Sequence, residues 1–190
     1  MGCLSGIAQA ITNSCTNVPS AGLEVKGWII NRADVTWTID ADNVVLLTGA
    51  TMAGGTFAYP ITAVKKEMNA GFDAVIADNL PDLFTHNISF QPYERKSANI
   101  LALDSIDDIV VVLELKGEKI SGCFIVLGYE TGLHLVSMSY RANDNNGIPT
   151  YEFATKEGQG EKYSRYIFWD TGIEGDYITT KALLVALQET

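Results

Sequence analysis

The strongest hydrophobic pattern in the chain lies between residues 109 and 140. Ile109–Leu115 is a run rich in β-branched residues, residues 123–127 form a second apolar run, and residues 133–140 alternate apolar with smaller or polar side chains. Residues 128–132 contain two glycines and separate the last two runs. A short glycine-containing linker between two strand-like runs is typical of a β-hairpin. The pattern therefore predicts an antiparallel meander of three strands.

Shorter alternating or apolar segments predict further strands on both sides of this meander. They lie at residues 23–31, 34–39, 44–47, 57–64, 85–92, 150–156 and 163–170. Together these segments predict a mainly β (α+β) fold, an antiparallel β-sandwich or half-open barrel with one or two short helices.

Two segments suit helices, and a third is ambiguous. Residues 96–104 fit a short helix capped by Ser97, with Ile100, Leu101 and Leu103 packed against the core. Residues 177–188 fit a C-terminal helix. Residues 61–79 fit a helical stripe and also two strands around a turn at residues 69–71; we favour the strands because the flanking pattern is β.

Two segments are low in charge and bulk, which is unusual for simple connectors. Residues 1–22 predict an extended N-terminal arm ahead of a single β-rich domain at 23–190, and residues 48–56 (TGATMAGGT) predict a loop. Small side chains allow close backbone approach, so both segments suit contact with a neighbouring subunit, although plain flexible loops fit equally well. The candidate interface residues are Cys3, Leu4, Ile7, Thr48, Gly49, Ala50, Thr51, Met52, Ala53, Gly54 and Gly55.

Composition narrows the classes of function. Hydrophobic residues make up 47% of the chain and charged residues only 19%, below the quarter or so of ordinary soluble domains. The net charge of −10 disfavours tight binding to nucleic acid or to anionic membranes. No apolar run approaches the roughly 18 residues of a membrane-spanning helix. Three cysteines favour a reduced setting, with pairing of Cys3 and Cys15 left open.

The chain carries no motif of catalysis or metal binding. His86 and His134 lie in separate strand-like segments without ligands at the right spacing, and no HExxH, CxxC or GxSxG motif occurs. Residues 143–147 resemble part of a calcium loop but lack its first and last acids. We therefore expect a protein that is not an enzyme and that uses no metal or cofactor.

One order of elements resembles a known class of proteins. An arm with Cys3 and Cys15 leads into a strand, and FIVLGYETGLHLVS and ATKEGQGE follow the 100–115 region. This layout, with LGYETGL as its closest match, resembles small virion proteins of tailed phages of Bacteroidetes, of the tail-tube or neck type. The resemblance implies a tail-tube-like sandwich with a flanking helix, either residues 96–104 or part of 61–79.

The resemblance also implies a function and partners. It implies a virion protein, assembled in the host cytoplasm, whose stacked hexameric rings surround a lumen that conducts DNA. Its partners would be its own copies and other virion proteins, without membrane or tight nucleic-acid binding. The acids that would line the lumen are Asp40, Asp42, Asp104, Asp107 and Asp108.

Three other functions stay open at this point. The chain also suits a head–tail connector, tail terminator or capsid decoration protein. A ligand-binding β-sandwich would use Trp28, Trp37 or Trp169 as a stacking platform. An enzyme would use the acids at positions 104, 107 and 108.

Overall fold

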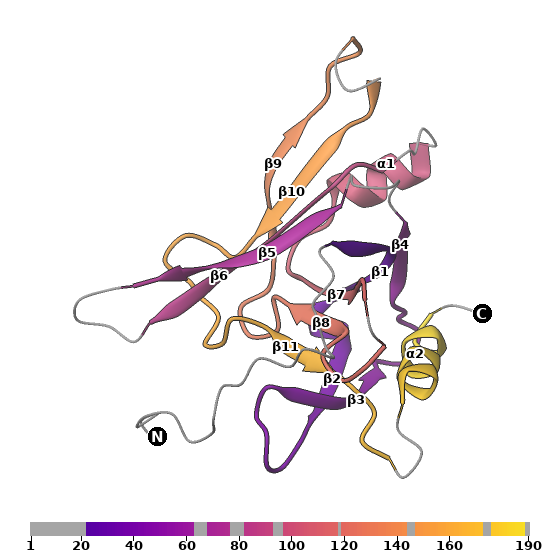
Figure 1. Ribbon diagram of the computed structural model, residues 1–190. Helices are drawn as coiled ribbons and strands as arrows, with labels where there is room; N and C mark the ends of the chain where they lie inside the picture. The colour runs from indigo at the N-terminus through magenta and orange to yellow at the C-terminus, as the bar shows by residue number, and fades with distance from the viewer. Residues whose placement is uncertain are drawn as a thin grey trace.

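In its described residues, the computed structural model has two β-sheets, two α-helices and projecting hairpins (Figure 1). The structure describes residues 22–62, 68–76, 82–92, 97–117, 119–143, 147–172 and 176–188. The seven-stranded sheet, here sheet A, has the order β2 (Val35–Ile39), β3 (Leu46–Met52), β11 (Tyr166–Phe168), β8 (Phe124–Leu127), β7 (Ile109–Leu115), β1 (Leu23–Asn31) and β4 (Tyr59–Thr62). The four-stranded sheet, here sheet B, has the order β5 (Asn69–Val75), β6 (Leu83–Phe90), β10 (Thr150–Ala154) and β9 (His134–Ser139). The predicted mainly β fold with short helices is confirmed.

Strand β7 is the middle of the fold because it is buried on both faces. Its odd-numbered residues, such as Val111 and Leu113, pack with residues of sheet B. Its even-numbered residues, such as Val110 and Val112, pack in a second cluster that includes Leu184 of helix α2 (Tyr177–Ala186). A strand covered on both sides needs apolar residues at successive positions, which explains the continuous run of the sequence. Sheet A is therefore the central layer, with sheet B on one face and α2 on the other.

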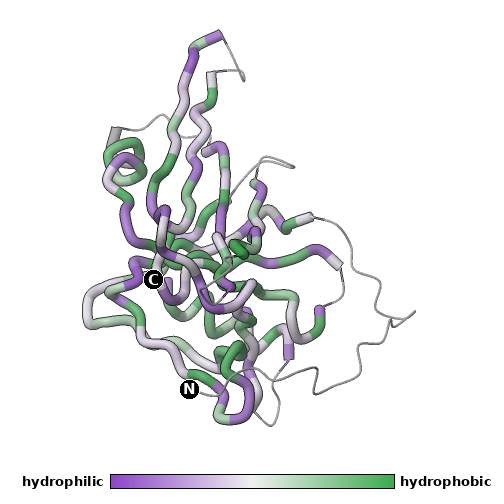
Figure 2. Tube along the Cα trace, turned by 90° about the vertical axis from the view of Figure 1, so that its left-hand side faces the viewer, coloured by the Kyte–Doolittle hydropathy of each residue, from purple (hydrophilic) through white to green (hydrophobic). Residues whose placement is uncertain are grey.

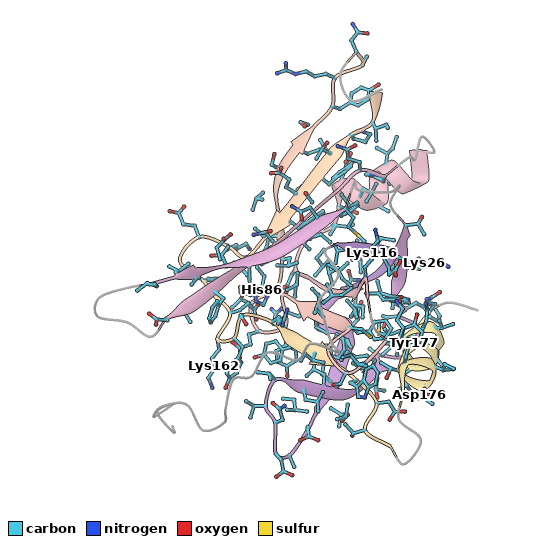
Figure 3. All side chains as sticks on the ribbon, viewed as in Figure 1. Lys26, His86, Lys116, Lys162, Asp176 and Tyr177 are labelled. Carbon is cyan, nitrogen blue, oxygen red and sulfur yellow. The ribbon has the colours of Figure 1, made fainter. Side chains whose placement is uncertain are left out.

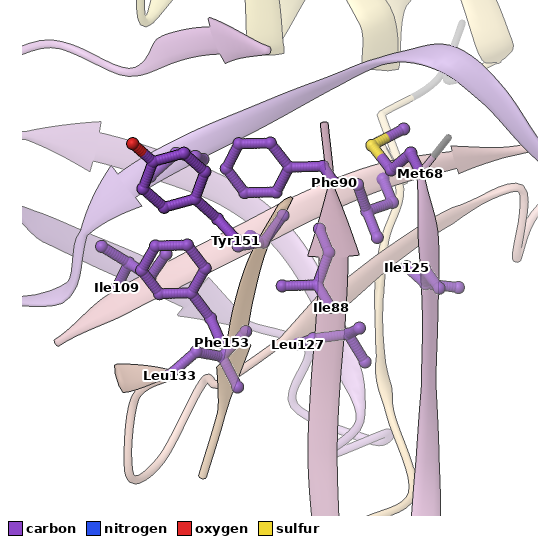
Figure 4. Close-up of a cluster of buried hydrophobic side chains, with 12 residues drawn as sticks. Met68, Ile88, Phe90, Ile109, Ile125, Leu127, Leu133, Tyr151 and Phe153 are labelled. Atoms are coloured by element: carbon purple, nitrogen blue, oxygen red, sulfur yellow. The ribbon is translucent and has the colours of Figure 1, made fainter. Parts of the chain in front are cut away.

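The cluster between the two sheets is dense and aromatic-rich (Figure 4). Phe90 of β6 stacks on Tyr151 and Phe153 of β10 with ring centroids 6.1 and 5.8 Å apart. Figure 4 shows these rings beside Ile109, which belongs to sheet A. We call the side of sheet B that packs against sheet A its inner face.

The predicted three-strand meander is wrong at its last step. Strands β7 and β8 pair antiparallel, but β9 pairs with β10 in the other sheet. Gly128 and Gly132, at φ +76° and +78°, allow a turn that carries the chain from sheet A to sheet B. The glycine-containing segment at 157–161 also crosses between the sheets, because it connects β10 of sheet B with β11 of sheet A.

The predicted loop at 48–56 is also wrong over most of its length. Residues 48–52 belong to β3, which pairs antiparallel with β2 and parallel with β11. Only residues 53–56 remain outside a strand. Pairing with β2 orders residues 49–52, although their own side chains are mostly small, and the parallel pairing with β11 involves Leu46 and Leu47 just before them.

Other segments confirm or correct smaller expectations. The ambiguous region contains β4 and β5 as strands on either side of residues 63–67, which lie outside the described part, and the turn expected at 69–71 is the start of β5. Helix α1 (Ser97–Asp104) agrees with the prediction, but its packing does not. Leu103 lies against the core, whereas Ile100 and Leu101 are exposed. The predicted arm, Cys3, Leu4, Ile7 and the Cys3–Cys15 pairing lie outside the described residues.

Candidate assembly surface

The hairpins of sheet B extend beyond the sheet that they pack against. In Figure 1 the β9–β10 hairpin reaches to the top and the β5–β6 hairpin to the left, away from sheet A. Hydrophobic positions occur along the projecting strands as well as in the centre of the molecule (Figure 2). The edge strands of sheet B are β5 and β9.

At the β9 edge, apolar side chains of the inner face are uncovered. Met138 lies directly opposite Tyr151 in the strand register, and opposite residues of an antiparallel pair share one face. Tyr151 is 3% exposed, yet Met138 is 52% exposed. The border of the covered area therefore runs between β10 and β9. Tyr140, two positions further on, is also exposed.

The β5 edge repeats this arrangement at the other side of the sheet. Phe72 lies opposite the buried His86, on the face that Ile88 turns toward the core. Its ring contacts Phe84 edge-on at 6.0 Å, but Phe72 remains 41% exposed. Ile76, which follows the strand, is 79% exposed. We call Phe72, Ile76, Met138 and Tyr140 the uncovered border of sheet B.

Burial of this border would be favourable. Fully burying one large apolar side chain contributes roughly 1.5–3 kcal/mol. An edge strand also leaves backbone N–H and C=O groups available for pairing with another chain. The uncovered border combines both properties, which are typical of an interaction surface.

A buried polar network holds the turn at residues 128–132. Glu161 is completely buried, and its carboxylate accepts hydrogen bonds from the backbone N–H of Glu130 and from the N–H and hydroxyl of Thr131, each at 2.9 Å. Successive N–H groups in a turn form an anion-binding nest. Glu130 in turn accepts the hydroxyl of Tyr166 at 2.6 Å and the N–H of Lys162 at 2.9 Å. The network joins the segment before β11 to the crossing between the sheets.

His86 is the other buried polar group of this network. Its Nδ1 accepts the N–H of Gly128 at 3.1 Å, so its Nε2 carries the proton toward the carbonyl of Tyr163 at 3.0 Å. Burial lowers the pKa of His86 and keeps the ring neutral. Both nitrogens have partners inside the fold, so His86 positions the turn.

The acids predicted to line a lumen lie in two separate places. Asp40 accepts the N–H groups of Asp42 and Asn43 in the turn between β2 and β3. Residues 104, 107 and 108 lie at the connection from α1 to β7. The prediction that all five face one lumen stays a prediction.

The three acids at the connection from α1 to β7 each contact a different partner. Asp104 accepts the hydroxyl of Tyr151, and Asp107 binds His134, whose hydrogen bond lowers the pKa of Asp107. Asp108 forms a two-pronged pair with a guanidinium group, that of Arg32, at 2.7 and 2.9 Å. Asp108 also has φ +57°, a conformation uncommon for residues other than glycine. The three carboxylates are thus each bound by a different side chain, and their use in acid–base chemistry stays a prediction.

A second buried carboxylate anchors α2. Glu114 of β7 accepts hydrogen bonds from Lys119 at 2.5 Å, the hydroxyl of Tyr177 at 2.7 Å and Lys181 at 3.1 Å. Burial opposes ionisation of Glu114, but these three donors outweigh it and lower its pKa. Burial raises the pKa of the nearby Cys123 thiol to about 11, so that thiol is protonated and unreactive.

The tryptophans differ in their suitability as a stacking platform. Trp28 is 2% exposed, so it cannot stack on a ligand at the surface. Trp37 packs edge-on against Phe168 and Tyr129, at 5.9 and 6.4 Å. Trp169 is half-buried against the same cluster.

Sequence reasoning missed the residues that matter most here. Glu114 had a signal, because it is a single acid within an apolar strand run. Glu161 had none, and the apolar residues of the uncovered border gave no sign of their exposure, since both depend on which strands meet in space. Residues 48–55, expected at an interface, lie mainly in β3, and their role in assembly stays a prediction.

Among the described residues, no three His, Cys, Asp or Glu side chains come together as a metal site. In the same part of the chain, no helix has the length and hydropathy to cross a membrane. No protein-family model, curated protein or solved structure matches the chain.

Proposed function

We propose that this chain is a structural protein that assembles with its own copies, as a ring-forming component of the tail tube of a tailed bacteriophage. The observation that carries the proposal is the uncovered border of sheet B. The same face of the same sheet is buried in the centre and apolar but exposed at both edges. A neighbouring copy supplies the missing cover.

Two further features support this proposal. The two buried carboxylates, Glu114 and Glu161, have all their partners inside the fold, so the best-formed polar clusters serve structure. The net charge of −10 also suits a DNA conduit, because an acidic surface repels the phosphate backbone. The place in the particle, the tail tube, rests on the sequence resemblance alone.

Microscopy and sedimentation of the purified chain test the proposal. We expect rings or tubes of the wild-type protein by negative stain and a mass of several chains in solution. A wild-type chain that stays monomeric at high concentration refutes self-assembly. Copy number per particle separates a tube protein from a connector, terminator or decoration protein.

A matched pair of variants tests the surface itself. Met138→Asp places a charge on the uncovered border, whereas Ser139→Asp places the same charge on the next residue, which faces the other way. Both positions are exposed, so neither change should alter the fold. We expect M138D to abolish assembly and S139D to retain it. Equal behaviour of the two variants would show that the border is not the interface.

A further inference from the structure

Two connections between the sheets meet at one histidine. His86 of β6 is completely buried. Its Nδ1 accepts the N–H of Gly128, in the turn from β8 to β9, and its Nε2 donates to the carbonyl of Tyr163, in the connection from β10 to β11. Figure 3 shows His86 in the middle of the molecule, above Lys162 of that second connection. One imidazole ring of sheet B therefore binds two segments that cross to or from sheet A.

The bond from Gly128 requires a neutral ring. A neutral histidine has one N–H and one free lone pair, whereas a protonated ring has an N–H at both nitrogens. Nδ1 uses its lone pair to accept the N–H of Gly128, so a second proton at Nδ1 would place two N–H groups against each other. The ring would keep its bond to Tyr163 and lose its bond to the turn.

The carboxylates near the ring extend the effect of that proton. Glu161 and, more weakly, Glu130 attract a positive charge on His86. Both oxygens of Glu161 already accept N–H groups of the turn, from Glu130 and Thr131. Attraction of Glu161 to a charged ring therefore competes with the bonds that hold the turn.

Two cations near the crossing have other partners. Arg32 donates to a carbonyl of the turn at 3.2 Å, and its charge is balanced by its pair with Asp108. The ammonium group of Lys162 lies over the ring of Tyr163. From β5, the residue opposite the histidine is the apolar Phe72. The two carboxylates are therefore the main charges that act on the histidine ring.

The turn itself is built to move as a unit. It begins and ends with glycines, Gly128 and Gly132, at φ +76° and +78°, and glycine changes its backbone conformation more easily than other residues. Between these glycines, the turn is held by side chains of other elements, His86, Glu161 and Arg32. A segment held in this way can open locally while the strands on either side stay paired.

We propose that His86 is an acid-sensitive switch, which releases the turn at residues 128–132 from the crossing between the sheets when its ring binds a second proton. The inference goes beyond the proposed function and does not depend on it, because every contact involved lies within one copy. Its outcome is a local opening between sheet A and sheet B in mild acid.

The pH range of the switch follows from the difference between the open and closed states. When the turn opens, water reaches the ring and its pKa returns to the ordinary value of 6.5. In the closed fold, burial lowers the pKa of His86. The closed turn therefore has its full stability above pH 6.5 and loses stability as pH falls from 6.5 toward the lower pKa. Within this range, each pH unit raises the ratio of open to closed turns by up to about tenfold.

Hydrogen exchange of the Gly128 N–H, followed by NMR from pH 7.5 to pH 5.5, tests the switch. The protection factor compares the measured exchange rate with that of an unstructured chain at the same pH, so the direct effect of pH cancels. We expect the protection factor of Gly128 to fall by about five- to tenfold over this range. Gly128 should also exchange faster than Val112 of β7 at each pH, because the turn opens while the central strand stays folded.

Two asparagine variants locate the response. Asparagine has an amide oxygen close to the position of Nδ1, so His86→Asn keeps an acceptor for Gly128 but does not titrate. His134→Asn is the matched control, because His134 also reaches the turn, at the carbonyl of Thr131, and binds Asp107. We expect the protection factor of Gly128 to change by less than about twofold in H86N and to fall as in wild type in H134N.

A titration of the wild-type ring decides the question if H86N does not fold. The nitrogen shifts of His86 should show a neutral ring, with its proton on Nε2, at pH 6.5. A ring at least half charged at this pH overturns the inference, because opening would then bind no additional proton. A protection factor of Gly128 that stays constant in wild type or H134N, falls equally in H86N, or equals that of Val112 also overturns it.

Discussion

Replacing Glu161 is expected to loosen the crossing between the two sheets. Glu161→Ala removes the acceptor of two backbone N–H groups, those of Glu130 and Thr131, in a fully buried place. A buried donor that loses its partner costs about 1–3 kcal/mol, so the two N–H groups together cost roughly 2–6 kcal/mol. This is a large part of the 5–15 kcal/mol or so by which domains are stable.

Glu161→Gln gives a graded version of the same change. Oε1 of Glu161 accepts both bonds from Thr131, and Oε2 accepts the single bond from Glu130. In the glutamine variant, an amide oxygen at the position of Oε1 keeps both bonds from Thr131. The amide NH2 group at the position of Oε2 cannot accept a hydrogen bond, so the N–H of Glu130 loses its acceptor. We expect a loss of about 1–3 kcal/mol, smaller than for alanine.

Urea unfolding followed by tryptophan fluorescence measures these losses. Glu157→Ala, in the same connection but exposed, is the control and should change stability by no more than about 0.5 kcal/mol. Each curve is recorded at two protein concentrations, because self-association would make stability depend on concentration. The role of the nest is refuted if E161A is within about 0.5 kcal/mol of the wild-type stability. It is also refuted if E161A loses no more stability than E161Q.

Three further changes test other contacts by similar measurements. Gly132→Ala should cost about 1–3 kcal/mol more than Gly158→Ala. A Cβ at residue 132 would lie 2.0 Å from Oδ1 of Asp108, which must then leave its pair with Arg32, whereas a Cβ at residue 158, at a similar φ, meets no atom within 4 Å. Equal losses of stability in the two variants contradict the clash. Cys123 should resist a thiol reagent at pH 8 until urea unfolds the chain, and rapid native labelling contradicts its burial. The pKa of Glu114 is lowered in the fold, so the stabilisation from its ionised form is present above the unfolded pKa of about 4.3 and disappears as pH falls through the lower folded pKa. Unfolding curves of E114Q should lack this loss of stability in acid. A pH dependence of stability equal to that of wild type contradicts the role of Glu114.

Local patterns in the sequence predict the elements of this fold better than their partners. The bounds of β1 and β7 match the predicted runs because β-branched residues signal a strand without reference to the rest of the chain. Gly128 and Gly132 correctly signal a turn, but a turn alone does not indicate which sheet the next strand joins. Strand β3 was predicted only at residues 44–47, and its continuation through residue 52 was missed because the order of that part comes from pairing with β2 and not from its own side chains.

The candidate assembly surface, too, was predictable in its local pattern but not in its contacts. The hydrophobicity of Met138 and Ile76 is visible in the sequence, but their exposure depends on where sheet A ends. The same holds for Ile178, which belongs to a predicted helix whose buried face only the packing reveals. Glu114 could be singled out from its apolar neighbours, while its three hydrogen-bond donors come from the β7–β8 connection and α2.

Strand β11 has a consequence for the order in which the protein forms during translation. Among the described strands of sheet A, β11 alone pairs the β2–β3 hairpin with the rest of the sheet, through the parallel pairing of Leu46 and Leu47 with Ile167 and Phe168. The hairpin therefore lacks this neighbouring strand until some 120 later residues have been synthesised, by subtraction of the paired positions (167 − 46 = 121). Such late closure slows folding, and a message truncated just before codon 166 would yield a chain whose early hairpin has no parallel partner strand.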